Sequence, residues 1–282
     1  MKIIRGAREV LEATSESRRR GLTIGLVPTM GWFHEGHLSL MRRARAECGL
    51  TVVTLFVNPA QFGDPRDLAA YPRDEERDCA MAAAEGVDIV FAPSATEMYP
   101  RLFATTVTVL GVSEPFEGQA RGATHFAGVA TILAKMFNIV QPTVAYFGQK
   151  DAQQALVVRK LVRDMNVPVR IEVCPTIREP DGLAMSSRNV RLGPADRTRA
   201  LALRAGLEAG LEAIRRGERH ARAVESAGRE AMRAIGVEPE YFAAVPAETL
   251  LPTDTLTGEV LLAVAARVGD VRLIDNEIVR IA

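Results

Sequence analysis

Short apolar runs that are rich in β-branched residues alternate with helical patterns along about the first 175 residues of this chain. The runs that we expect to form strands are residues 23–27, 51–57, 88–91, 105–110, 143–147 and 169–173. The segments that we expect to form helices, with apolar side chains three and four residues apart, are residues 6–20, 38–47, 74–85, 127–139 and 152–165. Several runs are apolar throughout, which is typical of strands that are covered on both faces. The alternation therefore predicts an α/β fold, a Rossmann-like parallel sheet with helices wound on both faces.

The character of the chain changes after about residue 176, where a polar stretch begins. The helices expected beyond it are residues 194–217 and 219–235, and the expected strands are residues 241–245, 260–268 and 273–281. A chain of 282 residues is long for one hydrophobic core, because domains usually hold about 100–200 residues. We therefore expect a Rossmann-like domain over residues 1–176 and a smaller α+β domain over residues 177–282.

The charge balance limits the classes of partner. Lysine and arginine together number 35, and aspartate and glutamate also number 35, so no net field would hold the chain on nucleic acid or on an anionic membrane. The 3 cysteines are odd in number and far apart, which indicates free thiols in a reducing compartment. The N-terminal segment has no apolar core of a signal peptide, and no run of ~18 uncharged apolar residues occurs. We expect a cytoplasmic protein that binds neither nucleic acid nor membrane.

Two histidines follow the first expected strand of the sheet core, His34 and His37 in the pattern His-x-Gly-His. Ligands of parallel sheets bind outside the carboxyl ends of the strands, and residues 28–31, 58–61 and 148–151 all come directly after a strand. A strand-to-helix turn exposes unpaired N–H groups and the positive end of the helix dipole, which suits phosphate. The turn lacks Gly-x-Gly-x-x-Gly, which argues against a dinucleotide site. The pattern indicates phosphate chemistry with imidazole donors.

Further motifs occur in order over residues 22–192. They are Pro28-Thr29-Met30-Gly31 with His34-Glu35-Gly36-His37, Asn58-Pro59 with Gln61-Phe62-Gly63, Tyr71-Pro72-Arg73, Gly148-Gln149-Lys150-Asp151 with Gln154, and Asp181-Gly182-Leu183-Ala184-Met185-Ser186-Ser187-Arg188-Asn189. Together they resemble the pantothenate synthetase (pantoate–β-alanine ligase) family of the nucleotidylyltransferase-like adenylating superfamily. The C-terminal part matches only in layout and in Ile274-Asp275-Asn276. The resemblance implies that pantoate and β-alanine are condensed with ATP and Mg²⁺ through a pantoyl-adenylate, with release of AMP and pyrophosphate, by a homodimer.

The resemblance also implies roles for individual residues. ATP would contact Pro28, Thr29, Met30, Gly31, His34, His37, Gly148, Gln149, Lys150, Asp151, Ile177, Met185, Ser186, Ser187 and Arg188. The catalytic donors would be His34, His37, Lys150 and Arg188. Pantoate would contact Gln61, Gln154 and Met30, β-alanine would contact Gln61, and Asp78 would be associated with the metal. The attacking carboxylate is already ionised, so the site needs no protein nucleophile, only donors that hold two anions in line and stabilise the developing charge.

Some roles stay open at this stage. Either histidine, water or phosphate could take the proton of the β-alanine ammonium. Asp151 could cap the following helix or contact the ribose. Mg²⁺ could be held mainly by phosphates and water, since Arg77 stands directly before Asp78.

The chain departs from the family pattern at two places. Trp32-Phe33 replaces a small residue followed by leucine, and we expect Trp32 to pack behind the turn or against a partner subunit. The loop from Arg121 to Phe126 is one residue longer than usual and lacks proline. We therefore expect His125 to be a structural residue at a helix start.

Two other functions compete with the ligase. One is a nucleotidylyltransferase that acts on a phosphorylated small molecule, which would need further cations near Gln61 and Gln154. The other is a catalytically silent nucleotide-binding or regulatory protein, which the retained His34, His37, Lys150 and Arg188 disfavour.

Overall fold

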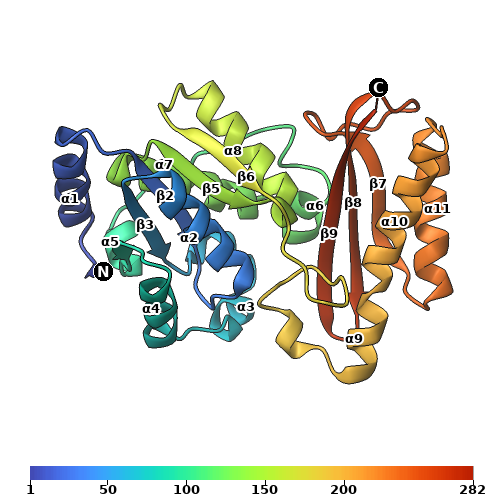
Figure 1. The fold of residues 1–282 in the computed structure, drawn as a ribbon, viewed down its shortest axis with the longest axis horizontal. Coiled ribbons are helices and arrows are strands. Elements are labelled where there is room, and N and C mark those ends of the chain that lie inside the picture. The colour runs from blue at the N-terminus through green and yellow to red at the C-terminus, as the bar shows by residue number, and fades with distance from the viewer. Residues whose placement is uncertain (282) are drawn as a thin grey trace. The chain divides into compact units, whose positions relative to one another are not determined.

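A sheet of six parallel strands organises the first of two units in the computed structural model, which describes residues 1–281 (Figure 1). This unit comprises Met1–Gly148 and Gln153–Pro175, and the second comprises Gln149–Ala152 and the chain from Thr176 onward. The strand order is β1-β4-β3-β2-β5-β6. The strands are β1 (Lys2–Ile4), β2 (Ile24–Thr29), β3 (Leu50–Leu55), β4 (Ile89–Phe91), β5 (Val144–Gly148) and β6 (Arg170–Cys174). The predicted Rossmann-like parallel sheet is confirmed.

Helices cover both faces of this sheet (Figure 1). They are α1 (Ala7–Arg19), α2 (Glu35–Glu47), α3 (Pro65–Ala70), α4 (Glu75–Ala84), α5 (Ala95–Met98), α6 (Glu117–Arg121), α7 (Thr124–Val140) and α8 (Ala152–Asp164). Successive strand residues serve opposite faces: Leu26 packs in the core with α7, whereas Val27 packs with α2 and α4. Burial on both faces is why these strands are apolar throughout.

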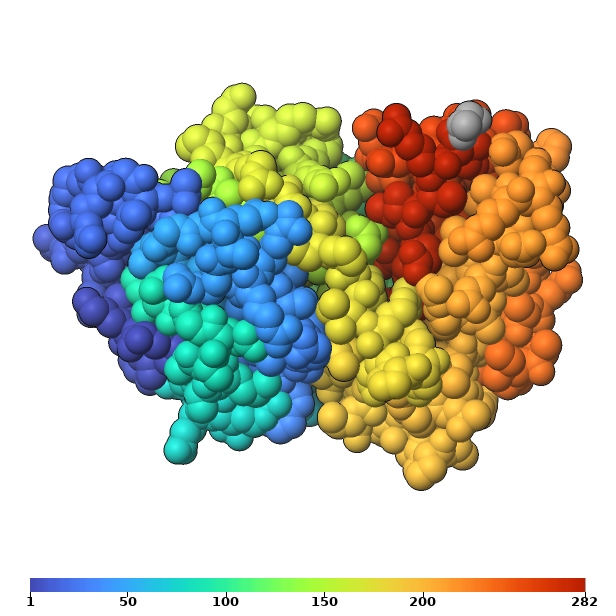
Figure 2. Space-filling view, in the orientation of Figure 1, coloured from blue at the N-terminus to red at the C-terminus, as the bar shows by residue number. Residues whose placement is uncertain are grey.

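Helices α2 and α4 lie side by side at the surface of the first unit, in blue and teal in the space-filling view (Figure 2). Arg42 of α2 joins them, because its guanidinium donates to Glu85 at 2.8 and 2.9 Å and also pairs with Glu35. Helix α2, which follows β2, and helix α4, which precedes β4, are thus tied together on the outside of the sheet.

No helix within residues 1–281 is long and apolar enough to cross a membrane.

The central strands bring the predicted ligand segments to one edge. Strand β2 lies between β3 and β5, and all three run in the same direction. The turn after β2, the 3₁₀ turn η1 (Pro59–Gln61) after β3, and the 3₁₀ turn η2 (Gln149–Asp151) after β5 therefore follow adjacent carboxyl ends.

Two expectations for the first unit are wrong. Residues 105–110 are irregular and pair with no strand among residues 1–281, although Val109 is buried and the N–H of Val107 donates to the Thr131 hydroxyl at 2.9 Å. Buried and exposed side chains alternate here as they do in a strand, but no neighbouring strand within residues 1–281 pairs with this segment. Conversely, no strand was expected before residue 23, but β1 pairs with β4 at the edge of the sheet. Its three residues are too few to show the alternation of a strand.

The second unit is built on an antiparallel sheet of β7 (Pro239–Pro246), β8 (Gly258–Val268) and β9 (Val271–Ile281), in that order. Helices α10 (Ala202–Arg215) and α11 (Ala221–Ala234) pack against it (Figure 1). The predicted single helix over 194–217 is wrong, because α9 (Pro194–Ala200) ends in a tight turn at Leu201. The Leu201 N–H bonds to Thr198, three residues back, and apolar spacing does not register so local a break. The predicted α+β architecture is confirmed.

Candidate active site

The two histidines form the first turn of α2. His34 is the N-cap residue, and its Nδ1 accepts the N–H of Gly36 at 3.1 Å. His37 reaches back, and its Nδ1 accepts the N–H of His34 at 3.3 Å. Helix α2 therefore begins three residues earlier than the predicted residue 38, because two imidazoles take the capping roles that Ser and Glu usually fill.

These hydrogen bonds assign the histidine tautomers. A ring nitrogen that accepts an N–H carries no hydrogen, so each neutral imidazole has its hydrogen on Nε2. The ring centroids lie 4.2 Å apart, at the positive end of the α2 dipole. A Cβ at Gly36 would lie 2.9 Å from the His34 ring, so glycine is needed for the ring to fold back. The two Nε2–H groups therefore lie at the end of the helix whose partial charge favours an anion.

Helix α4 holds this turn from behind. The Asp78 carboxylate, 1% exposed, accepts the N–H of Trp32 at 2.6 Å and that of Phe33 at 2.8 Å. Arg77 donates to Asp78 at 3.1 Å and to the Phe33 carbonyl at 2.8 Å, and its guanidinium lies 5.0 Å from the centre of the Trp32 ring. Phe33 is buried, whereas Trp32, for which packing behind the turn or against a partner was expected, is half-buried and contacts Arg77. A φ of +53° at Trp32 and +88° at Gly31 makes the tight turn that these contacts stabilise.

The same contacts bear on the predicted metal role of Asp78. Both of its oxygens already accept hydrogen bonds from the turn and from Arg77. Among residues 1–281, no group of three or more His, Cys, Asp or Glu side chains is placed to hold a metal ion. These residues do not fit a metal cage formed by protein ligands, and the metal role of Asp78 gains no support.

Replacing Asp78 with asparagine should lower the free energy of unfolding of the ligand-free protein by about 1–3 kcal/mol. The amide offers one acceptor oxygen, and its NH₂ group would face a buried N–H donor. Urea unfolding measures the change. Asp164→Asn, in a solvent-screened pair with Lys160, is the control and should leave the free energy of unfolding near the wild-type value. Equal stability of the Asp78 variant and the wild type would contradict the structural role.

Gln61 is oriented by a chain of hydrogen bonds. Burial raises the pKa of Tyr99 to about 12, although the bond to Asn58 lowers it, so the phenol stays protonated. Its OH donates to Asn58 Oδ1 at 2.7 Å, and Asn58 Nδ2 donates to Gln61 Oε1 at 2.9 Å and to the Gly128 carbonyl at 3.1 Å. With its oxygen engaged, Gln61 has its NH₂ group left to donate. His125, the second residue of α7, donates from Nδ1 to the Gln61 carbonyl at 2.8 Å.

The two adjacent glutamines of α8 differ in role. Gln153 is buried, accepts the N–H of Glu117 at 3.0 Å and donates to the carbonyls of Val112 and Pro115 at 2.9 and 2.7 Å. It therefore fixes the loop before α6. Gln154 is half-buried on the first turn of α8, where the predicted pantoate contact lies.

A cavity of about 350 Å³ opens at the carboxyl ends of β2, β3 and β4. Met30, Leu55 and Phe56 give it an apolar wall, and Arg73 and Asp74 give it charged groups. Its size and mixed lining suit a small organic molecule with both polar and apolar parts.

The remaining predicted ATP contacts lie in the second unit. Lys150 is in η2, and its side chain is 18% exposed. Residues 177–185 form a small hairpin, in which the Met185 N–H donates to the Ile177 carbonyl at 2.9 Å and Gly182, with a φ of +95°, makes the bend. Ser186, Ser187 and Arg188 follow it directly, and the Arg188 N–H donates to the Ser186 hydroxyl oxygen at 3.2 Å.

The predicted residues thus fall into two groups. Pro28, Thr29, Met30, Gly31, His34, His37, Gln61, Gly148 and Gln154 lie in the first unit, and Gln149, Lys150, Asp151, Ile177, Met185, Ser186, Ser187 and Arg188 lie in the second. Sequence reasoning missed the supporting roles of Asn58, Tyr99 and Arg77. Asn58 stands before Pro59, which is a recognisable start of a helical turn, but nothing in the sequence relates Tyr99 to it.

The fold defines an α/β protein with a Rossmann-like sheet, and the histidine turn lies at the carboxyl end of its central strand β2, where such folds usually bind their ligands. The model of the pantoate–β-alanine ligase family matches residues 2–278, and the chain belongs to this family. A pantothenate synthetase of Moorella thermoacetica is 49% identical over 282 residues, 100% of this chain and 99% of that protein.

Solved structures agree with this membership. The pantothenate synthetase of Thermus thermophilus has a TM-score of 0.92 and 45% identity, over 98% of this chain and 99% of that one. The pantoate–β-alanine ligase of Francisella tularensis, solved in complex with β,γ-ATP and β-alanine, has a TM-score of 0.78 and 31% identity, over 98% of this chain and 97% of that one.

Proposed function

We propose that this chain joins pantoate to β-alanine in two steps, with ATP as the source of the adenylyl group. Family membership supports the reaction, and the observation that carries the mechanism is the pair of imidazoles whose Nδ1 atoms accept backbone N–H groups at the head of α2. This pair supplies Nε2–H donors for a phosphate that gains charge.

In the first step a carboxylate oxygen of pantoate attacks the α-phosphorus of ATP. The new P–O bond forms as the bond to the β-phosphate oxygen breaks, which gives pantoyl-adenylate and pyrophosphate. No proton moves, because the carboxylate is ionised at neutral pH. His34 and His37 donate to the α-phosphate, and Lys150 with Ser186, Ser187 and Arg188 donates to the departing pyrophosphate. Fixed donors of this kind stabilise a transition state whose charge exceeds that of the ground state.

In the second step the amine of β-alanine attacks the acyl carbon, and the C–O bond to AMP breaks. The ammonium must first lose a proton. A histidine with its hydrogen on Nε2 and its Nδ1 engaged by a backbone N–H is a donor and not a base. We therefore propose that water or a phosphate oxygen accepts the proton that the β-alanine ammonium loses.

The two units divide this work. We propose that the first unit binds pantoate and the adenylyl group, with the NH₂ of Gln61 and the amide of Gln154 donating to pantoate. The second unit, which includes Lys150 in η2, acts as a lid for the triphosphate. Mg²⁺ would enter with ATP, held by phosphate and water oxygens, since the residues around Asp78 do not fit a metal site.

Exchange of labelled pyrophosphate into ATP tests this function. We expect exchange that requires pantoate and proceeds without β-alanine, because adenylation precedes amide formation. Gln61→Ala should raise the pantoate concentration needed for half-maximal exchange and leave that for ATP unchanged. Exchange that requires β-alanine, or that is independent of pantoate, would contradict the adenylate mechanism. Exchange supported only by a phosphorylated substrate would favour a nucleotidylyltransferase instead.

We also propose a homodimer in the cytoplasm. Residues 105–110 have the composition of a strand but no strand partner among residues 1–281, and a second copy would supply one. The three cysteines are free and buried, in keeping with a reducing compartment. Sedimentation equilibrium and cell fractionation test the two statements, and a monomer or a secreted protein would contradict them.

A further inference from the structure

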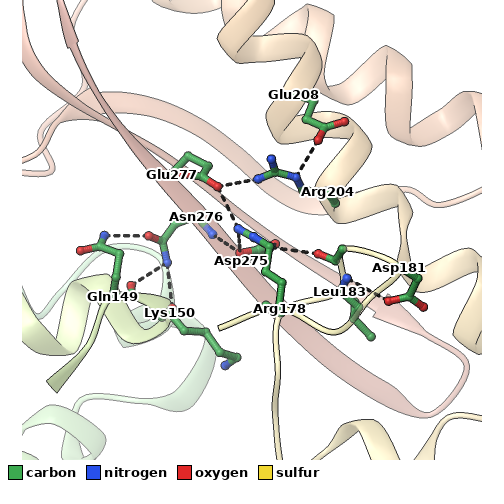
Figure 3. Close-up of polar contacts among 12 residues, drawn as sticks. Gln149, Lys150, Arg178, Asp181, Leu183, Arg204, Glu208, Asp275, Asn276 and Glu277 are labelled. Carbon is green, nitrogen blue, oxygen red and sulfur yellow. Dashed lines mark hydrogen bonds and ion pairs between the residues drawn. The ribbon is translucent and has the colours of Figure 1, made fainter. Parts of the chain in front are cut away.

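Asp275 and Asn276 are adjacent on β9, an edge strand of the second unit's sheet (Figure 3). They are 3% and 4% exposed, so both polar side chains are buried. Successive residues of a strand point to opposite faces, and each of the two therefore reaches a different part of the unit. Buried polar groups of this kind need partners, and the partners show what the pair does.

Asn276 holds the backbone of η2. Its Nδ2 donates to the Gln149 carbonyl at 3.0 Å and to the Lys150 carbonyl at 2.8 Å. Its Oδ1 accepts Gln149 Nε2 at 2.8 Å. The Lys150 side chain extends away from these bonds (Figure 3), so Asn276 fixes the base of the lysine, and the ammonium group lies 3.9 Å from an Asp151 carboxylate oxygen.

Asp275 holds Arg178 on the other face. Arg178 donates to both carboxylate oxygens, at 2.6 and 3.1 Å, and also to the Gly182 carbonyl at 3.2 Å. Burial lowers the pKa of Arg178, but Asp275 and Glu277 raise it more, and the guanidinium stays charged. Arg178 thereby closes the hairpin of residues 177–185 from one side. The strand of this hairpin that begins at Leu183 leads directly into Ser186, Ser187 and Arg188.

We propose that the Asp275–Asn276 dipeptide is the positioning element for both segments that bind the triphosphate. Asn276 places Lys150, and Asp275, acting through Arg178, places residues 186–188. The inference rests on the proposed function, in which these segments hold the departing pyrophosphate. Two segments far apart in sequence would then keep a fixed spacing, because one rigid dipeptide of a paired strand anchors both.

Fixed placement matters because donors stabilise a transition state only at hydrogen-bond distance. A displacement of about 1 Å costs on the order of a hundredfold in rate. Removing the Nδ2 of Asn276 would release two carbonyls and allow η2 to shift. The binding of adenosine would not change, since the phosphate contacts alone depend on Lys150.

Asn276→Ala tests the inference. We expect pyrophosphate exchange to slow by about tenfold to a hundredfold and the KM for ATP to rise severalfold, with the KM for pantoate unchanged. Calorimetric affinity for ATP should fall more than affinity for AMP. Glu208→Ala is the control, because within residues 1–281 Glu208 pairs with Arg204 alone, at the outside of the same network, and its loss should leave exchange at the wild-type rate. If the alanine variant does not fold, Asn276→Asp keeps the acceptor for Gln149 and still lacks the two donors.

A double substitution separates positioning from mere stability. In a Lys150→Ala background, Asn276→Ala should cost less than about twofold, because its effect passes through Lys150. If Asn276→Ala slowed exchange by the same factor in the Lys150→Ala background as in the wild type, the inference would be overturned. Exchange rates and ATP affinities equal to those of the wild type in both Asn276 variants would also overturn it. If the wild type itself shows no pantoate-dependent exchange, the proposed function fails. The ATP and AMP affinities of the same variants then decide the positioning role separately.

Discussion

Replacing His34 with asparagine should lower the rate of pantoyl-adenylate formation about a hundredfold or more while changing the stability of the protein little. Asparagine is a favourable N-cap residue, and its oxygen can accept the Gly36 N–H that His34 Nδ1 accepts at 3.1 Å. What it loses is the Nε2–H, and removal of one fixed donor to a developing oxyanion costs about 10²–10³ in rate. Pyrophosphate exchange gives the rate, and urea unfolding gives the stability.

His34→Ala is the matched comparison. It removes both the donor and the cap, so it should show the same loss of rate and a further loss of about 1 kcal/mol in the free energy of unfolding. If asparagine retained the wild-type rate and alanine did not, His34 would act only as a helix cap. Equal rates in all three proteins would remove His34 from the mechanism.

The histidine turn shows which features a sequence pattern can predict and which it cannot. Two histidines after a buried strand predicted a phosphate site, and they do cap the helix that follows β2. The pattern placed the helix start at residue 38, because capping by imidazole is absent from the usual signals of Ser, Thr, Asp and Asn. The tautomers follow from distances of about 3 Å, which no spacing in the sequence encodes.

The supporting residues were harder to predict. Arg77 and Asp78 precede β4, yet they hold the turn after β2, and Tyr99 orients Gln61 through Asn58. The bonds Trp32–Asp78, Phe33–Arg77 and Asn58–Tyr99 join residues 41 to 46 positions apart, so they depend on how the strands are ordered in the sheet. Periodicity identifies the strands and their buried faces, but it carries no information on which side chains meet behind the site.

Replacing Lys150 with alanine should also lower the adenylation rate about a hundredfold or more, and it should raise the KM for ATP. The side chain is 18% exposed, its base is fixed by the bonds from Asn276 to the Gln149 and Lys150 carbonyls, and its ammonium group lies 3.9 Å from Asp151, so the lysine has limited freedom to lose on binding. A charge held in this way stabilises a departing pyrophosphate more than a mobile surface lysine would.

Two further lysine variants give this prediction its contrast. Lys160→Ala, on the exposed side of α8 in a pair with Asp164, should keep the wild-type rate. Lys150→Arg keeps the positive charge but replaces a compact ammonium with a planar fork, so it should restore only part of the rate. Single-turnover formation of pyrophosphate separates the chemical step from product release. A Lys150→Ala protein that forms pyrophosphate as fast as Lys160→Ala would show that the charge is supplied elsewhere. Full recovery with arginine would show that a positive charge at this position is sufficient and that the compact ammonium is not required.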